Sequence, residues 1–144
     1  MARPQKNRRV HTPPLYTNFK PAGIYARDLK QVILSLDEFE AIRLSDFIGM
    51  SQEEAALEME ISRPTFTRLI EAARKKMSDF LINGKILRLE GGNVHFRQNI
   101  LKCETCGYSF HTGFNTEIKS CPHCGSSKLQ NLAGSFGHGK CCVE

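Results

Sequence analysis

The sequence contains no hydrophobic run that approaches the roughly 18 apolar residues of a membrane-spanning helix. Its first residues are basic and lack the apolar stretch of a secretory signal peptide. We therefore expect a cytoplasmic protein that does not contact a membrane. The length of 144 residues allows one ordinary domain or two small ones.

The usual marks of an enzyme active site are missing as well. The sequence has no glycine-rich loop that would hold a phosphate, and no pairing of a nucleophile with a base. The two cysteine pairs described below would fill all four positions around a metal ion and leave none for a substrate. The sequence therefore predicts a protein that is not an enzyme.

Residues 51–70 carry the clearest functional signal. Ser51 is a favourable N-cap for a short helix, and Glu54 completes a capping-box pattern with it. Ser62 is a favourable N-cap for a second helix, and Pro64 falls in its first turn, where a missing N–H costs nothing. Two helices joined by a tight turn are typical of a helix-turn-helix, whose second helix enters the major groove of DNA.

The second helix has an apolar stripe and a polar face. The stripe, which we expect to be buried, consists of Phe66, Leu69, Ile70, Ala73, Met77, Phe80 and Leu81. The predicted DNA contacts on the opposite face and its flanks are Arg63, Pro64, Thr65, Thr67, Arg68, Glu71, Arg74 and Lys75. Arginine can donate two hydrogen bonds to a guanine edge or a phosphate, and threonine can contact a thymine methyl group. A solvated charged face on a packing helix is the alternative.

Charge is distributed unevenly along the chain. The formal net charge is +5, but Lys and Arg dominate residues 1–34 and 63–88, whereas Asp and Glu dominate residues 35–62. We expect the basic segments to face a polyanion and the acidic helices to lie behind them. Residues 1–30 form a basic arm, with a purely solubilising tail as the alternative. The predicted DNA contacts in this arm are Arg3, Lys6, Arg8 and Arg9.

Further secondary structure is predicted around these helices, within a domain over residues 31–90. Ser35 and Glu38 form a capping-box pattern that opens a helix, and Gly49 ends it. A short strand or extended segment precedes this helix. Residues 85–97 alternate between apolar and polar around a pair of glycines, which predicts a β-hairpin.

Two C-x-x-C pairs separated by residues 107–120 predict a metal site. Its ligands are Cys103, Cys106, Cys121 and Cys124. Such pairs bring four thiolates into a tetrahedron, and cysteines in a reducing compartment are better explained by metal than by disulfides. Zinc is the expected ion of this small ribbon domain over residues 91–132. Iron stays an alternative because thiolates bind both metals. The fold prediction is thus a mainly α helix-turn-helix domain followed by a small β zinc ribbon.

The C-terminal segment is harder to interpret. Residues 133–144 are predicted to be a flexible tail because glycines flank its cysteines. A second metal or redox role for His138, Cys141 and Cys142 stays open, although adjacent cysteines do not readily bind one ion without a strained turn. Two other histidines are predicted not to be ligands, namely His111 and His123.

Residues 44–70 resemble the helix-turn-helix in the fourth, promoter-binding region of bacterial sigma factors. The likeness is carried by Gly-Met-Ser-Gln-Glu-Glu at residues 49–54 and Ile-Ser-Arg at residues 61–63, and Glu60 departs from it where that motif usually has glycine. The chain has no counterpart of the polymerase-binding regions of sigma factors, which argues against a sigma factor as such.

Residues 1–92 more closely resemble a family of small bacterial and archaeal proteins, uncharacterised but described as DNA-binding. The matching segments are residues 1–4, 19–21, 36–38, 41–44, 51–55, 62–63, 73–76 and 89–92. The resemblance implies a sigma-like DNA-binding module and a role in transcription. It implies no particular target or effector.

The cysteine pairs, with Gly-Tyr following the first and Gly the second, resemble both zinc ribbons and rubredoxin-like domains. The leading prediction is a sequence-specific DNA-binding regulator of transcription with a structural Cys₄ zinc ribbon. One alternative is a rubredoxin-like iron–Cys₄ redox sensor or electron carrier coupled to DNA binding. Another is a scaffold whose ribbon binds protein or RNA. A homo-oligomer stays open, because paired DNA half-sites would require a dimer.

Overall fold

The computed structural model describes residues 8–138 and 140–142. The chain divides into two compact units: unit 1 contains Tyr16–Val94 and the arginines at positions 8 and 9, and unit 2 contains Val10–Leu15 and the residues from His95 onward. The first strand, β1 (Arg8–Val10), pairs with β5 (Val94–Phe96) in a two-stranded sheet.

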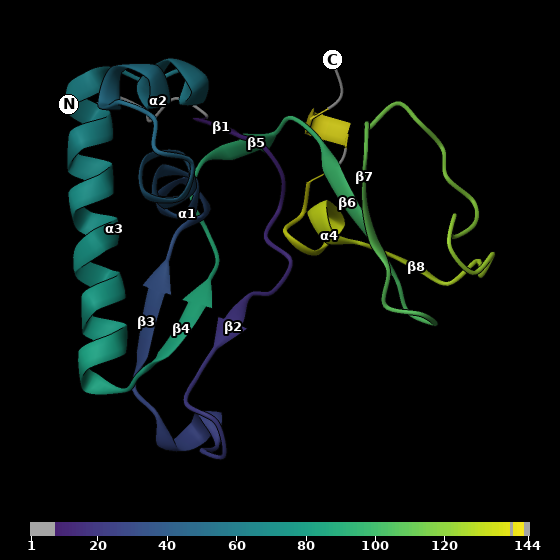
Figure 1. Cartoon of the computed structure of the whole chain (residues 1–144), viewed down its shortest axis with the longest axis horizontal. Helices are drawn as coiled ribbons and strands as arrows, with labels where there is room; N and C mark the ends of the chain where they lie inside the picture. Colours follow the sequence, from purple (N-terminus) through teal and green to yellow (C-terminus); the bar gives the residue numbers. More distant parts are fainter. Residues whose placement is uncertain (1–7, 139, 143–144) are drawn as a thin grey trace. The chain divides into compact units, whose positions relative to one another are not determined.

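Unit 1 contains the longest helix, α3 (Arg63–Asn83), drawn as the long teal ribbon in Figure 1. The Ser62 hydroxyl caps its first turn by accepting a backbone hydrogen bond, and Pro64 lies in that turn. Gly84, in the left-handed conformation, ends the helix. The cap at Ser62 and the place of Pro64 confirm the sequence prediction for the start of this helix. None of the helices in the described part of the chain is long and apolar enough to cross a membrane.

The shorter helix α2 (Gln52–Met59) precedes α3 and is joined to it by a tight turn. The Ser51 hydroxyl accepts from the backbone N–H of Glu54 and donates to its carboxylate, at 3.2 and 3.0 Å. Glu60 ends α2 with a φ of 59°, a left-handed conformation that glycine adopts at lower cost. The predicted pair of capped helices is therefore present, and the turn has the conformation expected of a glycine position.

A third helical segment begins at Ser35, whose side chain forms a complete capping box with Glu38. It runs as α1 (Leu36–Ile42) and continues directly into a π-helical segment, η2 (Arg43–Ile48). Gly49, with a φ of 89°, closes it. The predicted capping box and the predicted end at glycine are both confirmed.

Two hydrophobic clusters hold α3 in place. The first, shared with α1, η2 and α2, consists of Ala41, Leu44, Ala55, Ala56, Met59, Phe66, Leu69 and Ile70. The second, shared with the neighbouring sheet, consists of Val32, Leu34, Ala73, Leu87 and Leu89, with Met77 and Phe80 packed against it. The predicted stripe is confirmed except at Leu81, which is 69% exposed. The second cluster reaches only to Phe80, so the last turn of α3 extends past its packing partners.

The sheet of unit 1 has the strand order β2-β4-β3. Its central strand, β4 (Ile86–Leu89), pairs antiparallel with β2 (Asn18–Phe19) and parallel with β3 (Gln31–Leu34). A short 3₁₀ turn, η1 (Ala26–Asp28), lies between β2 and β3 in the sequence. Strands therefore form within the segment that the sequence assigned to a basic arm.

The predicted hairpin over residues 85–97 is wrong. Both edges of β4 are occupied by strands that lie far away in the sequence, and β5 pairs with β1 instead. The chain passes close to the start of α1 at Gly91 and Gly92. The Gly91 carbonyl accepts a hydrogen bond from the Leu36 amide at 3.0 Å. A Cβ on Gly92 would lie 2.9 Å from the Asp37 carboxylate, so this position needs glycine.

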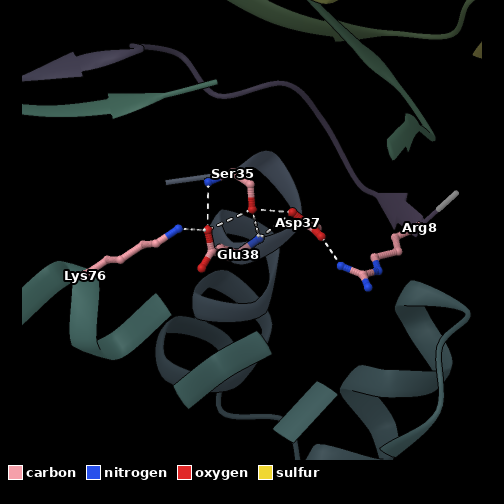
Figure 2. Close-up of polar contacts among 5 residues, drawn as sticks. All are labelled: Arg8, Ser35, Asp37, Glu38 and Lys76. Carbon is pink, nitrogen blue, oxygen red and sulfur yellow. Dashed lines mark hydrogen bonds and ion pairs between the residues drawn. The ribbon is translucent and has the colours of Figure 1, made fainter. Parts of the chain in front are cut away.

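A buried polar network joins α1 to two other elements of unit 1 (Figure 2). Asp37 and Glu38 are only 4% and 5% exposed. The guanidinium of Arg8 in β1 pairs with Asp37, and the Lys76 ammonium in α3 lies 2.6 Å from Glu38. The Ser35 hydroxyl, which has one proton to donate, lies within hydrogen-bond distance of both carboxylates. Because a buried carboxylate without a partner is strongly destabilising, these pairs fix β1 and α3 against α1.

Unit 2 is built on a three-stranded antiparallel sheet of order β7-β6-β8. Its strands are β6 (Asn99–Cys103), β7 (Ser109–Thr112) and β8 (Leu129–Asn131). The predicted small β domain is thus present. A helix, α4 (Leu132–Ser135), and a 3₁₀ turn, η3 (Lys140–Cys142), occupy the stretch that the sequence predicted as a flexible tail.

We expect Lys76→Ala to lower the free energy of unfolding by about 2 kcal/mol, because it leaves the buried Glu38 carboxylate without its cation. Urea denaturation followed by circular dichroism at pH 7 measures this change. Lys75→Ala removes the neighbouring exposed lysine of the same helix and serves as the matched control, with an expected change within about 0.5 kcal/mol. Equal effects of the two substitutions would contradict the stabilising role of the network.

Candidate nucleic-acid interface and metal centre

The polar face of α3 lies opposite both hydrophobic clusters, as helical periodicity requires. Its exposed members are Arg63, Pro64, Arg68, Glu71, Arg74 and Lys75, while Thr65 and Thr67 are half-buried. The predicted residues therefore share one accessible surface, which we call the α3 polar face.

Several members of the α3 polar face contact neighbouring elements. Arg63 lies 2.9 Å from Glu53 of α2. Arg74 lies 2.7 Å from Asp46 in η2, and its hydrogen bond holds the pKa of that carboxyl below its usual value. Both pairs are exposed, and exposed pairs contribute at most about 1 kcal/mol, so these arginines can exchange partners.

One threonine has a structural contact that the sequence did not predict. The Thr67 hydroxyl is 2.5 Å from the side-chain oxygen of Gln52 and 3.1 Å from the carbonyl of Arg63. The first bond links the start of α2 to α3. Thr67 therefore helps to fix the crossing of the two helices as well as lying on the α3 polar face.

Two cations of the α3 polar face differ from its other cations in their ion pairing. Among the residues that the structure describes, neither Arg68 nor Lys75 has an ion-pair partner within 4 Å. Arg68 lies in the second turn of α3, and Lys75 lies about two turns further along. A cation that has no carboxylate partner keeps its full attraction for a phosphate.

Two of the predicted contacts in the arm, Arg8 and Arg9, are paired with carboxylates of unit 1. Arg3 and Lys6 lie outside the described residues. Arg8 pairs with the buried Asp37 and its side chain is 15% exposed, so the predicted DNA contact at Arg8 conflicts with its place in the fold. Arg9 lies 3.4 Å from Glu60 at the turn between α2 and α3.

In unit 2 the four predicted cysteine ligands come together. The Sγ atoms of Cys103 and Cys124 are 3.5 Å apart, and those of Cys106 and Cys121 are 3.7 Å apart. All four atoms lie within 4.8 Å of one another. Zinc–sulfur bonds of about 2.3 Å place the corners of a tetrahedron about 3.8 Å apart, so this cluster has the size to hold one ion.

The backbone favours the ionised form of the first cysteine in each pair, whereas burial and the neighbouring thiols raise the pKa of the second, Cys106 and Cys124. The N–H of Cys106 points at the Cys103 sulfur at 3.4 Å, and the N–H of His123 points at the Cys121 sulfur at 3.3 Å. The backbone hydrogen bond from Cys106, together with weaker hydrogen bonds, lowers the pKa of the Cys103 thiol to about 6, against the opposing effect of burial. Since the thiolate is the form that binds metal, the first cysteine of each pair is in a favourable backbone setting for coordination.

Two glycines give these turns their shape. Gly107 and Gly125 follow the cysteine pairs with φ values of 78° and 77°. Their N–H groups bond back to the carbonyls of Cys103 and Cys121, each at 2.9 Å. The His123 side chain stacks on Tyr108 with ring centroids 5.4 Å apart, and the four-cysteine cluster does not include it.

A second group of side chains that could hold a metal ion lies elsewhere in unit 2. It consists of His95, His138, Cys141 and Cys142, whose ligand atoms also lie within 4.8 Å of one another. Burial and the nearby His95 lower the pKa of His138. Sequence reasoning noted the three tail residues but missed His95, because nothing in the spacing connects a histidine of β5 with the tail.

Comparison with known proteins gives a consistent family but no activity. The model of a family described as "Protein of unknown function DUF134" matches residues 1–97. The chain is 48% identical over 132 residues to a UPF0251 protein of Halothermothrix orenii, an alignment covering 89% of this chain and 98% of the relative. It is 42% identical over 141 residues to a UPF0251 protein of Moorella thermoacetica, covering 98% and 93%. No solved structure matches the chain.

We expect Cys106→Ser to reduce the metal content by one ion per chain, because an alcohol replaces one of four thiolates around the ion. Atomic-emission spectrometry of the purified, dialysed protein measures this. Thr105→Ala, in the same turn, is the matched control and should keep the full metal content, since its hydroxyl bonds to Ser126 and not to the cluster. Undiminished metal content in Cys106→Ser would contradict the site.

Proposed function

The chain belongs to the DUF134 family of proteins of unknown function, and from this starting point we propose that it binds double-stranded DNA sequence-specifically and regulates transcription. In this proposal α2 and α3 form a helix-turn-helix, and the α3 polar face enters the major groove. The Cys₄ cluster of unit 2 holds a structural zinc ion.

One observation carries the proposal: the first half of α3 is anchored on its inner side and displays cations on its outer side. Phe66 and Ile70 are fully buried in the first hydrophobic cluster. Arg68 lies between them in the sequence and points the other way, exposed. A rigid helix that presents an arginine near its N-terminus has the arrangement by which such modules contact base edges.

The placement of acidic residues also supports DNA binding. The carboxylates of Asp37, Glu38 and Glu40 are buried and paired inside unit 1, so their charge is largely neutralised within the fold. Glu53, in contrast, is exposed beside Arg63. On binding, Arg63 would transfer from this carboxylate to a phosphate, at little cost because the pair is exposed.

Zinc is the proposed ion of the Cys₄ cluster because closed four-thiolate sites in small ribbons are mostly structural. With all four positions filled by sulfur, the ion would stabilise unit 2 without offering a position to a substrate. A colourless protein that contains zinc agrees with this role, whereas a red protein that bleaches on reduction would point to iron and electron transfer.

We expect Arg68→Ala to weaken binding to a selected DNA site about 10- to 100-fold and to relax base preference at one position, because a guanidinium–base contact contributes about 1–3 kcal/mol of discrimination. Selection from random oligonucleotides would first define the site. Fluorescence anisotropy with this site and a scrambled duplex would then measure the effect. Unchanged affinity and unchanged preference would show that the α3 polar face does not contact bases.

We expect Lys75→Ala to weaken selected and scrambled DNA equally and to reduce the slope of log K against log salt by about one, because one phosphate contact is lost. The matched control is Lys30→Ala. This exposed lysine lies beside Asn83 and Gly84, at the other end of α3, and its removal changes the net charge equally. Equal loss of affinity in both variants would indicate a general charge effect and not a contact at Lys75.

A further inference from the structure

We propose that His95, His138, Cys141 and Cys142 form a second metal site, which binds a tetrahedral divalent ion of the zinc type. The site is separate from the Cys₄ cluster and from the α3 polar face, and an ion bound there would fix the C-terminal segment of unit 2 to β5.

The distances between the ligand atoms match one coordination sphere. The Sγ atoms of Cys141 and Cys142 are 3.7 Å apart. His138 Nδ1 lies 3.2 Å from the first sulfur and 3.5 Å from the second, and His95 Nδ1 lies 3.8 Å from the second. Bonds of about 2.3 Å to sulfur and about 2.0–2.1 Å to nitrogen give tetrahedral edges of about 3.8 Å between sulfurs and about 3.6 Å between nitrogen and sulfur.

The local fold allows adjacent cysteines to face the same point, which the sequence alone made doubtful. Residues 140–142 form the 3₁₀ turn η3, in which the sulfurs of the two adjacent cysteines lie 3.7 Å apart. Before this turn, Gly137 has a φ of 78°, and the N–H of His138 bonds to the carbonyl of Ala133 at 3.0 Å. The chain after α4 is therefore bent back, so that His138 and the cysteines meet.

The surroundings of the buried sulfur favour a bound thiolate. Cys142 is 9% exposed, and the backbone N–H of Phe96 points at its Sγ at 3.3 Å. The Phe96 ring also meets the His138 ring edge-on, with centroids 5.1 Å apart. Phe96 of β5 thus contacts two of the ligands, and the neighbouring His95 is itself a third. Contacts of this kind orient metal ligands.

The donor set selects the class of ion. Two sulfurs and two imidazole nitrogens in a tetrahedron suit zinc, whereas magnesium and calcium prefer oxygen ligands. The mutual separation of all four atoms within 4.8 Å fits a single ion. Bound there, the ion would clamp the tail against a strand that precedes it by more than forty residues.

The test counts metal ions on the full-length protein. We expect the wild-type chain, dialysed after exposure to zinc, to retain two ions per chain. Cys141→Ser and His138→Asn should each retain one, because both alter only the second site. Cys106→Ser should also retain one, from the loss of the Cys₄ ion. His111→Asn changes an exposed histidine outside both clusters and should retain two.

Cobalt substitution gives an independent reading that needs no variant. Cobalt in a site with two nitrogens absorbs at higher energy than cobalt bound by four sulfurs, because imidazole is the stronger-field ligand. Titration of the metal-free wild-type chain should therefore show two spectrally distinct sites, and Cys141→Ser should lack the higher-energy bands. A single class of all-sulfur site in the wild type, or two zinc ions retained in Cys141→Ser, would overturn the proposal. A cysteine pair that oxidises without binding zinc would overturn it equally.

Discussion

The apolar stripe of α3 is the constraint on which unit 1 depends. Its first half packs against α1, η2 and α2, and its second half packs against the sheet. One helix therefore contributes buried side chains to both clusters. Because each half of the helix is packed, the helix is not free to rotate about its own axis. The α3 polar face must then point outward. The proposed DNA-binding surface is a consequence of core packing, because no rotation that hides Arg68 keeps Phe66 and Ile70 buried.

The polar network around α1 complements this packing. Apolar contacts do not specify direction, whereas the Lys76–Glu38 pair and the Arg8–Asp37 pair each require particular partners. Because these acidic groups are buried beside basic partners, unit 1 holds them as paired charges in its interior. Carboxylates of α1 are neutralised inside the fold, and the cations of α3 that have no such partner stay at the surface. The strongly acidic segment of the sequence is thus compatible with a neighbouring anion-binding face.

Sequence reasoning succeeded where the determining contacts are local. Caps at Ser35, Ser51 and Ser62 depend on residues three positions away, and a helical stripe depends on spacings of three and four. It failed where the contacting residues are far apart in the sequence. The hairpin prediction missed that β2 and β3 occupy both edges of β4. The four cysteines were found because their spacing is itself the signal. His95 could not be found, because only the folded chain brings it to the tail.

Unit 2 has few large buried side chains, and this explains why metal ligands are so prominent in it. Besides Val10, Phe96 and Ile100, its buried apolar residues include three cysteines, Cys103, Cys121 and Cys142. Small domains with little apolar area commonly need an added crosslink to fold, and metal coordination supplies one. Each buried cysteine receives a backbone N–H bond at its sulfur, which an apolar core residue would not need. The ligands therefore act as part of the core of unit 2, and each bound ion should stabilise the segment that supplies its ligands.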